Sequence, residues 1–383
     1  MALEADPLPR ALGHRMTVLR NIHGLTQGDL ARRLEVGQSF LSQVERGARA
    51  VPDAMLVRAS REFALPLSFF TIMPNGADMG PVTFRKNSKA TALDERRIVE
   101  LFNEASRLFR HIGAASGYRT TELPDPSEFG EDPELIAEAM RAEAGLAPAA
   151  PVRNAVRATE RLGVGVVDNL DYIDSQVPGH TAVSRPTHLA DRPLVALVAE
   201  LPGAVKRLTV LHELGHLIFD RDLSEPVGIR SREEKRAYKF AGAYLLPADV
   251  VRQRVSESLN LHGYLPIKAD YGISVAAIIV RAKDLGVIST DRARSLQIQL
   301  AAQRWRYNEP VEVPDEQPLL LQQALGKVYG NQSAVKAAND VGVQTELVTR
   351  WAHLEPAVER SVTAVGDASN VIDFAAARAR RAS

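Results

Sequence analysis

Cysteine is absent from this sequence of 383 residues. Its absence excludes disulfide bonds and thiolate metal sites, and it is compatible with a reducing compartment. Histidine, aspartate and glutamate remain as the strong zinc ligands that the chain can offer. Any zinc site must therefore be built from imidazoles and carboxylates.

Net charge and long apolar runs are also missing. Lysine and arginine (47) balance aspartate and glutamate (47), so any surface that attracts nucleic acid must be a local one. The longest apolar run, VAAIIV at 275–280, is far shorter than the roughly 20 residues of a membrane-spanning helix. The opening MALEADPLPR lacks the apolar core of a signal peptide. We therefore expect a cytoplasmic protein with no membrane partner.

The length and three stretches rich in proline, glycine and acidic residues predict several domains. These stretches are MPNGADMGP (73–81), ELPDPSEFGEDPE (122–134) and NEPVEVPDEQP (308–318). The predicted segments are an N-terminal domain (1–75), a linker (76–125), a middle domain (126–307) and a C-terminal helical region (308–383).

The predicted linker carries a long amphipathic helix. Thr91 and Asp94 form a capping pair at its start. Apolar residues then recur at helical spacing, namely Ile98, Leu101, Phe102, Ala105, Leu108, Phe109 and Ile112. We interpret this helix as a packing helix or a dimer seam rather than as a carrier of chemistry.

The middle domain mixes helical and strand patterns. Residues 133–146 and 152–162 have the pattern of helices, whereas GVGVVDNL (163–170) and PLVALVAEL (193–201) predict short buried strands. The expected fold class is therefore mainly α with a small sheet (α+β), with an all-α domain before it and a helical region after it.

Residues 12–70 predict short helices joined by a tight turn. Thr26 and Asp29 cap a short second helix, and a turn at 35–37 leads into the helix QSFLSQVE. Leu41 and Val44 of that helix face inward, which leaves these side chains facing outward: Gln38, Ser39, Ser42 and Gln43. Glutamine bonds adenine with two hydrogen bonds and serine bonds many base edges, so this face suits the major groove.

This block resembles the Xre/lambda-repressor-like helix-turn-helix family, through LTQGDLA, VGQSFLSQVERG and LPLSFF. The resemblance implies that Gln27 contacts a phosphate and that the outward side chains of QSFLSQVE face the bases. Candidate phosphate contacts are Arg15, Arg20, Arg46 and Arg49. Glu35 stands where the family usually has glycine, which predicts a less sharp turn. The alternative is a helix-turn-helix used only for protein contact.

The stretch LTVLHELGHLIFD (208–220) contains an HExxH pattern. Its spacing places His212 and His216 one helical turn apart on one face, where two ring nitrogens can share a tetrahedral ion. Glu213 is placed to take a proton from a metal-bound water. The flanking residues are apolar, so the helix is expected to be buried, and buried polar groups of this kind need a partner such as a metal.

A second helix, SREEKRAYKFAGAYLLP (231–247), offers a third ligand. Glu234 lies on its inward stripe, whereas Glu233 points about 100° away. Asp220, four residues after His216, is the competing ligand. We favour Glu234.

Both helices resemble the ImmA/IrrE metallopeptidase family, which looks like a small gluzincin, across roughly residues 130–290. The resemblance rests also on ATERLGVGVV and YGISVAAIIVRAKDLGVI. It implies one zinc ion per chain on His212, His216 and Glu234, with Glu213 as general base. The sequence departs from the family at Asp220, where the family often has histidine, and at Leu208, where it often has phenylalanine.

The two resemblances together imply a DNA-binding transcriptional regulator that carries a zinc metalloendopeptidase domain. Its expected partners are a double-stranded DNA operator and a protein substrate. By resemblance, that substrate is a repressor or the chain itself, cleaved in a stress, phage or mobile-element response. The alternative is a repressor or activator that does not cleave and whose zinc domain senses a ligand or partner. A homodimer is left open.

The C-terminal region repeats the spacing of the first helix-turn-helix. The repeated positions are Ala338, Gly342, Val343, Val348 and Trp351. This echo predicts either a second helix-turn-helix or an ordinary helical cap, and we favour the cap. The last stretch, NVIDFAAARARRAS (370–383), is expected to be a disordered basic tail.

Overall fold

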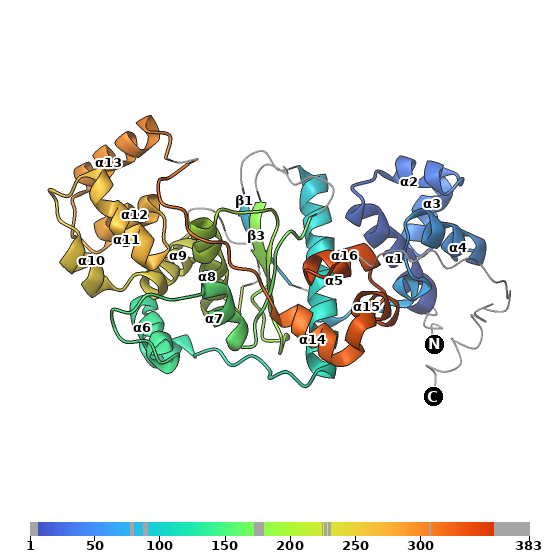
Figure 1. Cartoon of the computed structure of the whole chain (residues 1–383). Coiled ribbons are helices and arrows are strands. Elements are labelled where there is room, and N and C mark those ends of the chain that lie inside the picture. The colour runs from blue at the N-terminus through green and yellow to red at the C-terminus, as the bar shows by residue number, and fades with distance from the viewer. Residues whose placement is uncertain are drawn as a thin grey trace.

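The computed structural model describes residues 7–76, 80–86, 91–171, 180–223, 225, 228, 231–305 and 308–355. Helices surround one four-stranded sheet in the order β1-β3-β4-β2. The strands are β1 (Thr83–Lys86), β2 (Gly165–Val167), β3 (His180–Ser184) and β4 (Leu194–Leu197). β2 runs parallel to β4, and both other pairings are antiparallel. The sheet lies near the middle of an elongated molecule, with helices on both sides (Figure 1).

The N-terminal domain is entirely helical. Its elements are α1 (Pro7–Ile22), α2 (Gln27–Arg33), α3 (Gln38–Glu45), α4 (Asp53–Glu62) and the short 3₁₀ helix η1 (Leu67–Thr71). Thr26 and Asp29 form the predicted capping box before α2. The expectation of a less sharp turn at Glu35 is wrong, because Glu35 takes the left-handed conformation itself, with φ 54°. Its carboxylate pairs with Arg58 of α4, which offsets part of the cost of that conformation.

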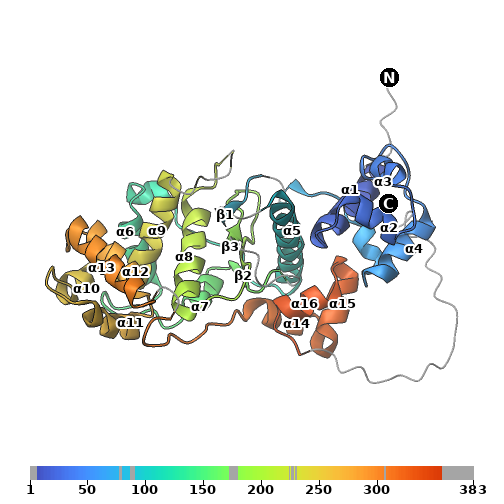
Figure 2. The same ribbon diagram turned by 90° about the horizontal axis from the view of Figure 1, so that it is seen from above.

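The long helix predicted after Thr91 is present as α5 (Ala92–Ala115), with the Thr91–Asp94 capping box in place. All seven apolar residues of its predicted stripe are buried. In Figure 2, α5 stands between the sheet and the N-terminal helices. The segment expected to be a linker therefore supplies both β1 and a helix that packs on the sheet.

The strands separate two cores by the usual alternation of side chains. On β4, Leu194 and Ala196 join the core on the α5 side, whereas Val195 and Leu197 face the opposite side. The strands predicted at 163–170 and 193–201 are confirmed as β2 and β4. Their neighbours β1 and β3 are additional to the sequence prediction.

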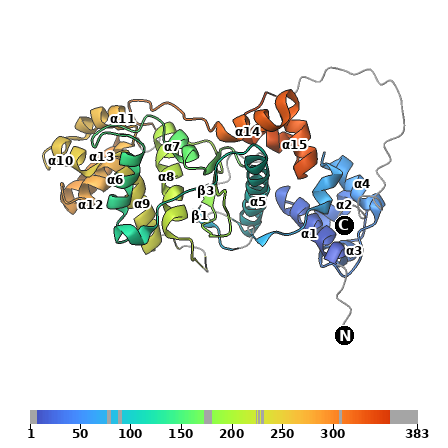
Figure 3. The same ribbon diagram turned by 90° about the horizontal axis from the view of Figure 1, so that it is seen from below.

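The helices of the middle domain lie on the other side of the sheet. These are α6 (Pro133–Glu143), α7 (Ala155–Arg161), α8 (Gly203–Phe219), α9 (Arg232–Leu245), α10 (Ala248–Arg254), α11 (Leu265–Tyr271), α12 (Val275–Asp284) and α13 (Thr290–Ala302). Of these helices, α7 and α8 contact the strands, and α9 packs on α8 (Figures 1 and 3). α8 is thus enclosed between the sheet and α9.

The C-terminal region forms α14 (Leu320–Tyr329), α15 (Ser333–Val341) and α16 (Thr345–Trp351). α15 and α16 meet at a turn where Gly342 is left-handed, with φ 71°, as Glu35 is in the first motif. The turn is docked, because Arg107 of α5 donates to the carbonyls of Val341 and Gly342. The pair therefore repeats the left-handed turn position of the first motif and packs on α5 and η1. The basic tail expected at 370–383 lies outside the described residues.

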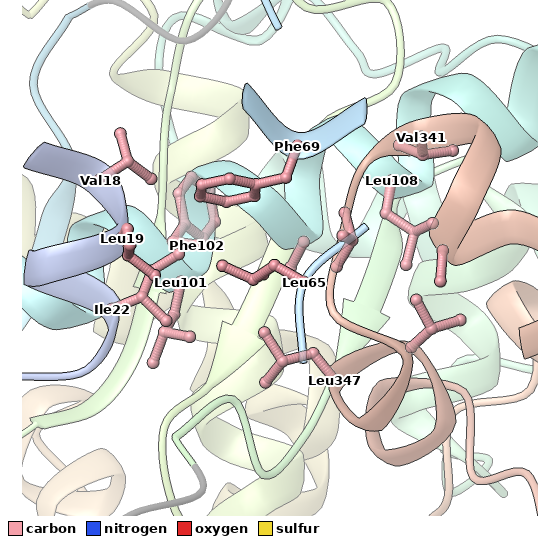
Figure 4. Close-up of a cluster of buried hydrophobic side chains, with 14 of the residues drawn as sticks. Val18, Leu19, Ile22, Leu65, Phe69, Leu101, Phe102, Leu108, Val341 and Leu347 are labelled. Carbon is pink, nitrogen blue, oxygen red and sulfur yellow. The ribbon is translucent and has the colours of Figure 1, made fainter. Parts of the chain in front are cut away.

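One core joins the N-terminal domain, α5 and the C-terminal helices (Figure 4). In it, Leu19 of α1 and Phe69 of η1 lie with Phe102 of α5 and Leu347 of α16. Polar contacts reinforce this packing: Gln344 donates to the carbonyl of Phe63, 3.1 Å away. The N-terminal domain is thus part of a larger packed body.

Among the described residues, no single helix combines the length and apolar character that crossing a membrane requires. Only the pair Leu261–Tyr271 and Val275–Asp284 meets that criterion, when its members are taken together, and it is bent by 101°. Its apolar residues contribute to the core around α9.

Candidate metal centre and helix-turn-helix surface

The HExxH pattern lies on α8, which is buried along nearly its whole length. The exposed fractions are 2% for His212, 1% for Glu213 and 0% for His216. Polar side chains at this depth require partners, because an unpaired buried polar group is costly. The partners come from three directions: α9, the C-terminal end of α8 and the sheet.

Glu234 of α9 faces the two histidines. Its two carboxylate oxygens lie 3.3 Å from Nε2 of His212 and 3.3 Å from Nε2 of His216. The two Nε2 atoms are 3.1 Å apart. Four tetrahedral ligands at about 2.0–2.1 Å from zinc are separated by about 3.3 Å from one another. One donor atom from each of the three residues lies within 4.8 Å of the others, which is close enough for the three side chains to converge on one ion.

The local sequence explains why Glu234 reaches this position. Ser231 caps α9 by accepting from the Glu234 N–H, 3.1 Å away, which starts the helix one turn before the inward stripe. Small residues then bring the two helices close together. A Cβ added at Gly215 of α8 would lie 3.0 Å from the Cα of Ala237 on α9.

Asp220 lies behind the histidines. It accepts from Nδ1 of His216 at 2.6 Å and from Arg236 at 2.5 Å. Since Nδ1 is the ring nitrogen turned away from Glu234, Asp220 is placed to orient the imidazole. The group of possible metal ligands consists of His212, His216 and Glu234, without Asp220.

The charges of these side chains stabilise one another. Burial alone would lower the pKa of His216, but hydrogen bonds to Asp220 and Glu234 outweigh it and raise that pKa to about 10. Burial would raise the pKa of Glu234, yet its hydrogen bonds to His212 and His216 lower that pKa to about 2. The site thus combines the charged carboxylate of Glu234 with the His216 imidazole, whose charged form is favoured, an arrangement suited to a divalent cation in place of a proton.

Glu213 is bound from the sheet by two hydroxyl groups. Its Oε2 accepts from Ser184 of β3 at 2.7 Å and from Thr83 of β1 at 3.0 Å. Both residues lie on the strand face that points to α8, and both are at most 2% exposed. Sequence reasoning missed them because they lie 130 and 29 residues from Glu213. The only local signal was a hydroxyl residue within each of two short segments.

The second candidate surface lies on α3 of the N-terminal domain. Leu41 and Val44 are buried, whereas Gln38, Ser39 and Gln43 are exposed. Ser42 is half-buried. Arg46 follows the helix, is exposed and donates to the carbonyl of Ser42. The predicted base-facing side chains therefore share one face.

The other proposed phosphate contacts differ in accessibility. Gln27 donates its amide to Glu45 at 2.7 Å, and Arg20 binds the same carboxylate at 2.7 Å. Arg49 is exposed and lies over the ring of Phe40. Arg15 is only 4% exposed and binds Glu104 of α5 at 2.8 Å. Arg15 therefore joins the domain to α5 and is not presented to DNA.

Comparisons with known proteins locate two families within the chain. Residues 11–61 match the model of a helix-turn-helix domain, and residues 162–283 match the model of a peptidase family described as the IrrE N-terminal-like domain. The second match includes β2, β3, β4, α8 and α9, whereas β1 and α5 lie outside both matches. No solved structure matches the chain significantly.

Part of the chain is also similar to a curated protein. The HTH-type transcriptional regulator RamB of Mycobacterium tuberculosis is 30% identical over 93 residues, in each of two strains. The match covers 24% of this chain and 19% of that regulator. The chain therefore matches about a fifth of the relative's length.

Proposed function

Because the chain joins a helix-turn-helix DNA-binding domain to an IrrE N-terminal-like domain, we propose that it is a DNA-binding regulator with zinc endopeptidase activity. The proposed substrate is a partner protein such as a repressor, or the chain itself. The proposed zinc ligands are His212, His216 and Glu234, and the proposed general base is Glu213. One zinc ion per chain is expected.

One observation carries the proposal. One ligand atom from each of His212, His216 and Glu234 lies within 4.8 Å of the others, and both histidines are already buried. Three protein ligands leave a fourth tetrahedral position open, which is typical of catalytic rather than structural zinc. The intact Glu213, which follows the proposed ligand His212 directly in the sequence, also favours catalysis, because a structural site needs no base.

The residues have separable roles in this proposal. A zinc ion held there would acidify water toward a pKa of about 7 and polarise a scissile carbonyl. His212, His216 and Glu234 bind the ion, and Asp220 holds the ring of His216 in place. Glu213 takes the proton from the attacking water and delivers it to the leaving amine. Ser184 of β3 fixes the rotamer of Glu213.

The first test is Glu213→Gln in the full chain. The variant keeps the size of the side chain but removes the base, so zinc content and fold should hold while cleavage falls by about 10²–10⁴-fold. Glu200→Gln, which changes an exposed glutamate, is the matched control. Metal analysis, operator binding and relief of repression in cells would be measured together.

The expected pattern for Glu213→Gln is normal zinc, normal operator binding and no relief of repression. Regulation equal to that of the wild type would contradict the peptidase proposal. That result would favour a zinc domain that senses a ligand or a partner without cutting it.

The second test concerns DNA binding by α3. Gln38→Ala or Gln43→Ala should relax sequence preference at one base pair, at a cost of about 1–3 kcal/mol. Arg46→Ala should instead weaken binding to all sequences alike and reduce the salt slope by about 1. Arg252→Ala, which removes an exposed arginine of the middle domain, controls for net charge. Unchanged affinity and preference in all three α3-region variants would place the DNA-reading surface elsewhere.

A further inference from the structure

Strand β1 is an addition to the sheet of the IrrE-like domain. The domain's matched segment, residues 162–283, contains β2, β3 and β4. β1 (Thr83–Lys86) comes from the segment between the N-terminal domain and α5, and it pairs only with β3, at the edge of the sheet. Without β1, strand β3 would therefore form an open edge of the sheet.

This edge lies beside the proposed general base. Thr83 of β1 is opposite Ser184 of β3, and their hydroxyl oxygens are 2.7 Å apart. Both hydroxyls reach Oε2 of Glu213. With β1 in place, Glu213 is only 1% exposed. The strand therefore both binds the carboxylate and helps to cover it.

The pairing of β1 is short and irregular. β1 has four residues, and its register with β3 shifts between Phe84 and Lys86. Irregular pairing at an edge is weakly specified and is a place where strands can exchange. A protein that binds an extended peptide by strand addition needs an unpaired edge of this kind. β1 occupies that edge with the chain's own backbone.

We propose that β1 is a self-bound strand that keeps the candidate peptidase site closed and that an extended peptide replaces it on β3. The proposal rests on the proposed function of the zinc site. When β1 leaves, the Thr83 hydroxyl moves away from Glu213. The same movement exposes the backbone groups of β3. The incoming ligand is an extended peptide segment whose backbone takes over the hydrogen bonds of β1.

The position of β1 in the chain couples this exchange to the rest of the molecule. η1 precedes it and α5 follows it, and both belong to the core that holds the N-terminal domain. Thr83 is therefore connected to Glu213 by a side-chain hydrogen bond and to the DNA-binding domain by the backbone. A shift of the N-terminal domain on α5 would act on the strand that covers the base.

The test locks and releases β1 in the full chain. Phe84 and Val183 are directly opposite each other, and opposed residues of antiparallel strands lie within disulfide range. The double variant Phe84→Cys with Val183→Cys would introduce the chain's only two cysteines. Single Phe84→Cys and Val183→Cys variants under the same oxidant are the controls. Thr83→Val removes the hydroxyl that binds Ser184 and Glu213, and so weakens the attachment of β1 without any cysteine.

Binding is measured by the fluorescence anisotropy of a labelled peptide with the sequence PVTFRK, residues 81–86. The oxidised double variant should bind it at least about ten-fold more weakly than the reduced form, because the peptide competes for an edge that is permanently filled. Thr83→Val should bind it more tightly than the wild type, because β1 is held less firmly on β3. In parallel, hydrolysis of unfolded casein by the zinc-loaded chain should fall on oxidation and recover on reduction.

The outcomes separate this inference from the proposed function. Equal peptide binding by both redox forms, no binding by either, or a disulfide that fails to form would overturn the inference even if casein is cleaved. Unchanged or faster casein hydrolysis in the oxidised form would also overturn it, and β1 would then be a permanent support of Glu213. Redox-controlled peptide binding without any hydrolysis would support strand exchange and contradict the peptidase proposal.

Discussion

The side chains around the candidate metal centre divide according to which imidazole nitrogen they face. Glu234 faces both Nε2 atoms, whereas Asp220 binds Nδ1 of His216 on the opposite side of the ring. Asp220 also accepts from Arg236, so its charge is already balanced. The two carboxylates therefore have different relations to a bound ion, although both lie near His216.

Zinc affinity should separate these two residues. Glu234→Gln removes a direct ligand and should weaken zinc binding more than Asp220→Asn, which removes an orienting partner and should cost about 10–100-fold. Competition with a chromophoric chelator measures both constants on the full chain. The reverse order would make Asp220 the third ligand.

Contacts between residues three or four positions apart could be predicted from the sequence. Contacts between residues of distant segments could not. The HExxH spacing and the inward stripe of α9 are local helical patterns, and they placed His212, His216 and Glu234 on facing surfaces. The contacts of Glu213 with Thr83 and Ser184 depend on strand pairing across 101 residues. No periodicity carries that information, so the environment of the base had to come from the structure.

At the scale of elements, the turn between α15 and α16 is held in a narrow space. A Cβ on Gly342 would lie 2.9 Å from the backbone nitrogen of Phe69 and 2.9 Å from the Cδ1 of Ile72. The turn also receives the two hydrogen bonds of Arg107. Glycine is thus required twice at this position, once for its backbone conformation and once for the close contact with η1.

A matched pair of substitutions separates these two requirements. Gly286 has a similar φ of 69°, but a Cβ there would meet nothing within 4 Å. Gly286→Ala should cost about 1–2 kcal/mol for the left-handed backbone alone. Gly342→Ala should cost about 1–3 kcal/mol more, because the added methyl group must displace η1. Urea unfolding of the full chain measures both, and equal costs would refute close docking of the turn.

Elements were predictable where their own sequence repeats a pattern. α5 shows seven apolar residues in helical register and a capping box, and its burial follows from them. The echo of the helix-turn-helix in α15 and α16 was also visible, but its role was not. The docking of that pair on η1 and α5 depends on surfaces that only the folded chain brings together. β1 was missed because it has only four residues and lies between segments rich in glycine, proline and charge, so its short alternation of Val82, Thr83, Phe84 and Arg85 did not stand out.

At the scale of the whole molecule, the end of the C-terminal region is tied to the sheet. His353 follows α16 and its Nε2 hydrogen-bonds Asp168, which comes directly after β2. Asp168 also accepts from Lys206 of α8 at 3.0 Å. The hydrogen bond and charge of Asp168 raise the pKa of His353 despite partial burial. The buried carboxyl of Asp168 has a lowered pKa because its bonds to His353 and Lys206 outweigh burial.

These shifts predict a pH dependence with a defined sign. Since the folded pKa of His353 is raised above its ordinary value of 6.5, its stabilising contribution is complete below pH 6.5. That contribution is lost as pH rises through the raised pKa. The melting temperature of the wild type should therefore exceed that of His353→Gln, and the difference should be largest at about pH 5–6. The difference in melting temperature should become smaller at alkaline pH.

The pKa of the His353 ring can be measured by NMR titration of the wild type, with His353→Gln as the comparison. A midpoint at or below the ordinary histidine pKa would contradict the contact with Asp168. A melting-temperature gap that does not change with pH would contradict the charge of His353 as the cause.

The shared core around α5 has a consequence for exchanging parts between proteins. Arg15 of the DNA-binding domain binds Glu104 of α5, and Gln344, which precedes α16, donates to the carbonyl of Phe63. A chimera spliced after η1 would separate Arg15 from Glu104, which leaves Arg15 with only the Phe69 carbonyl and Glu104 with only Arg107. To fuse the intact DNA-binding domain to a different protein, α5 and the helices α14, α15 and α16 would have to be transferred with it. In the sequence, however, most of the middle domain lies between α5 and α14.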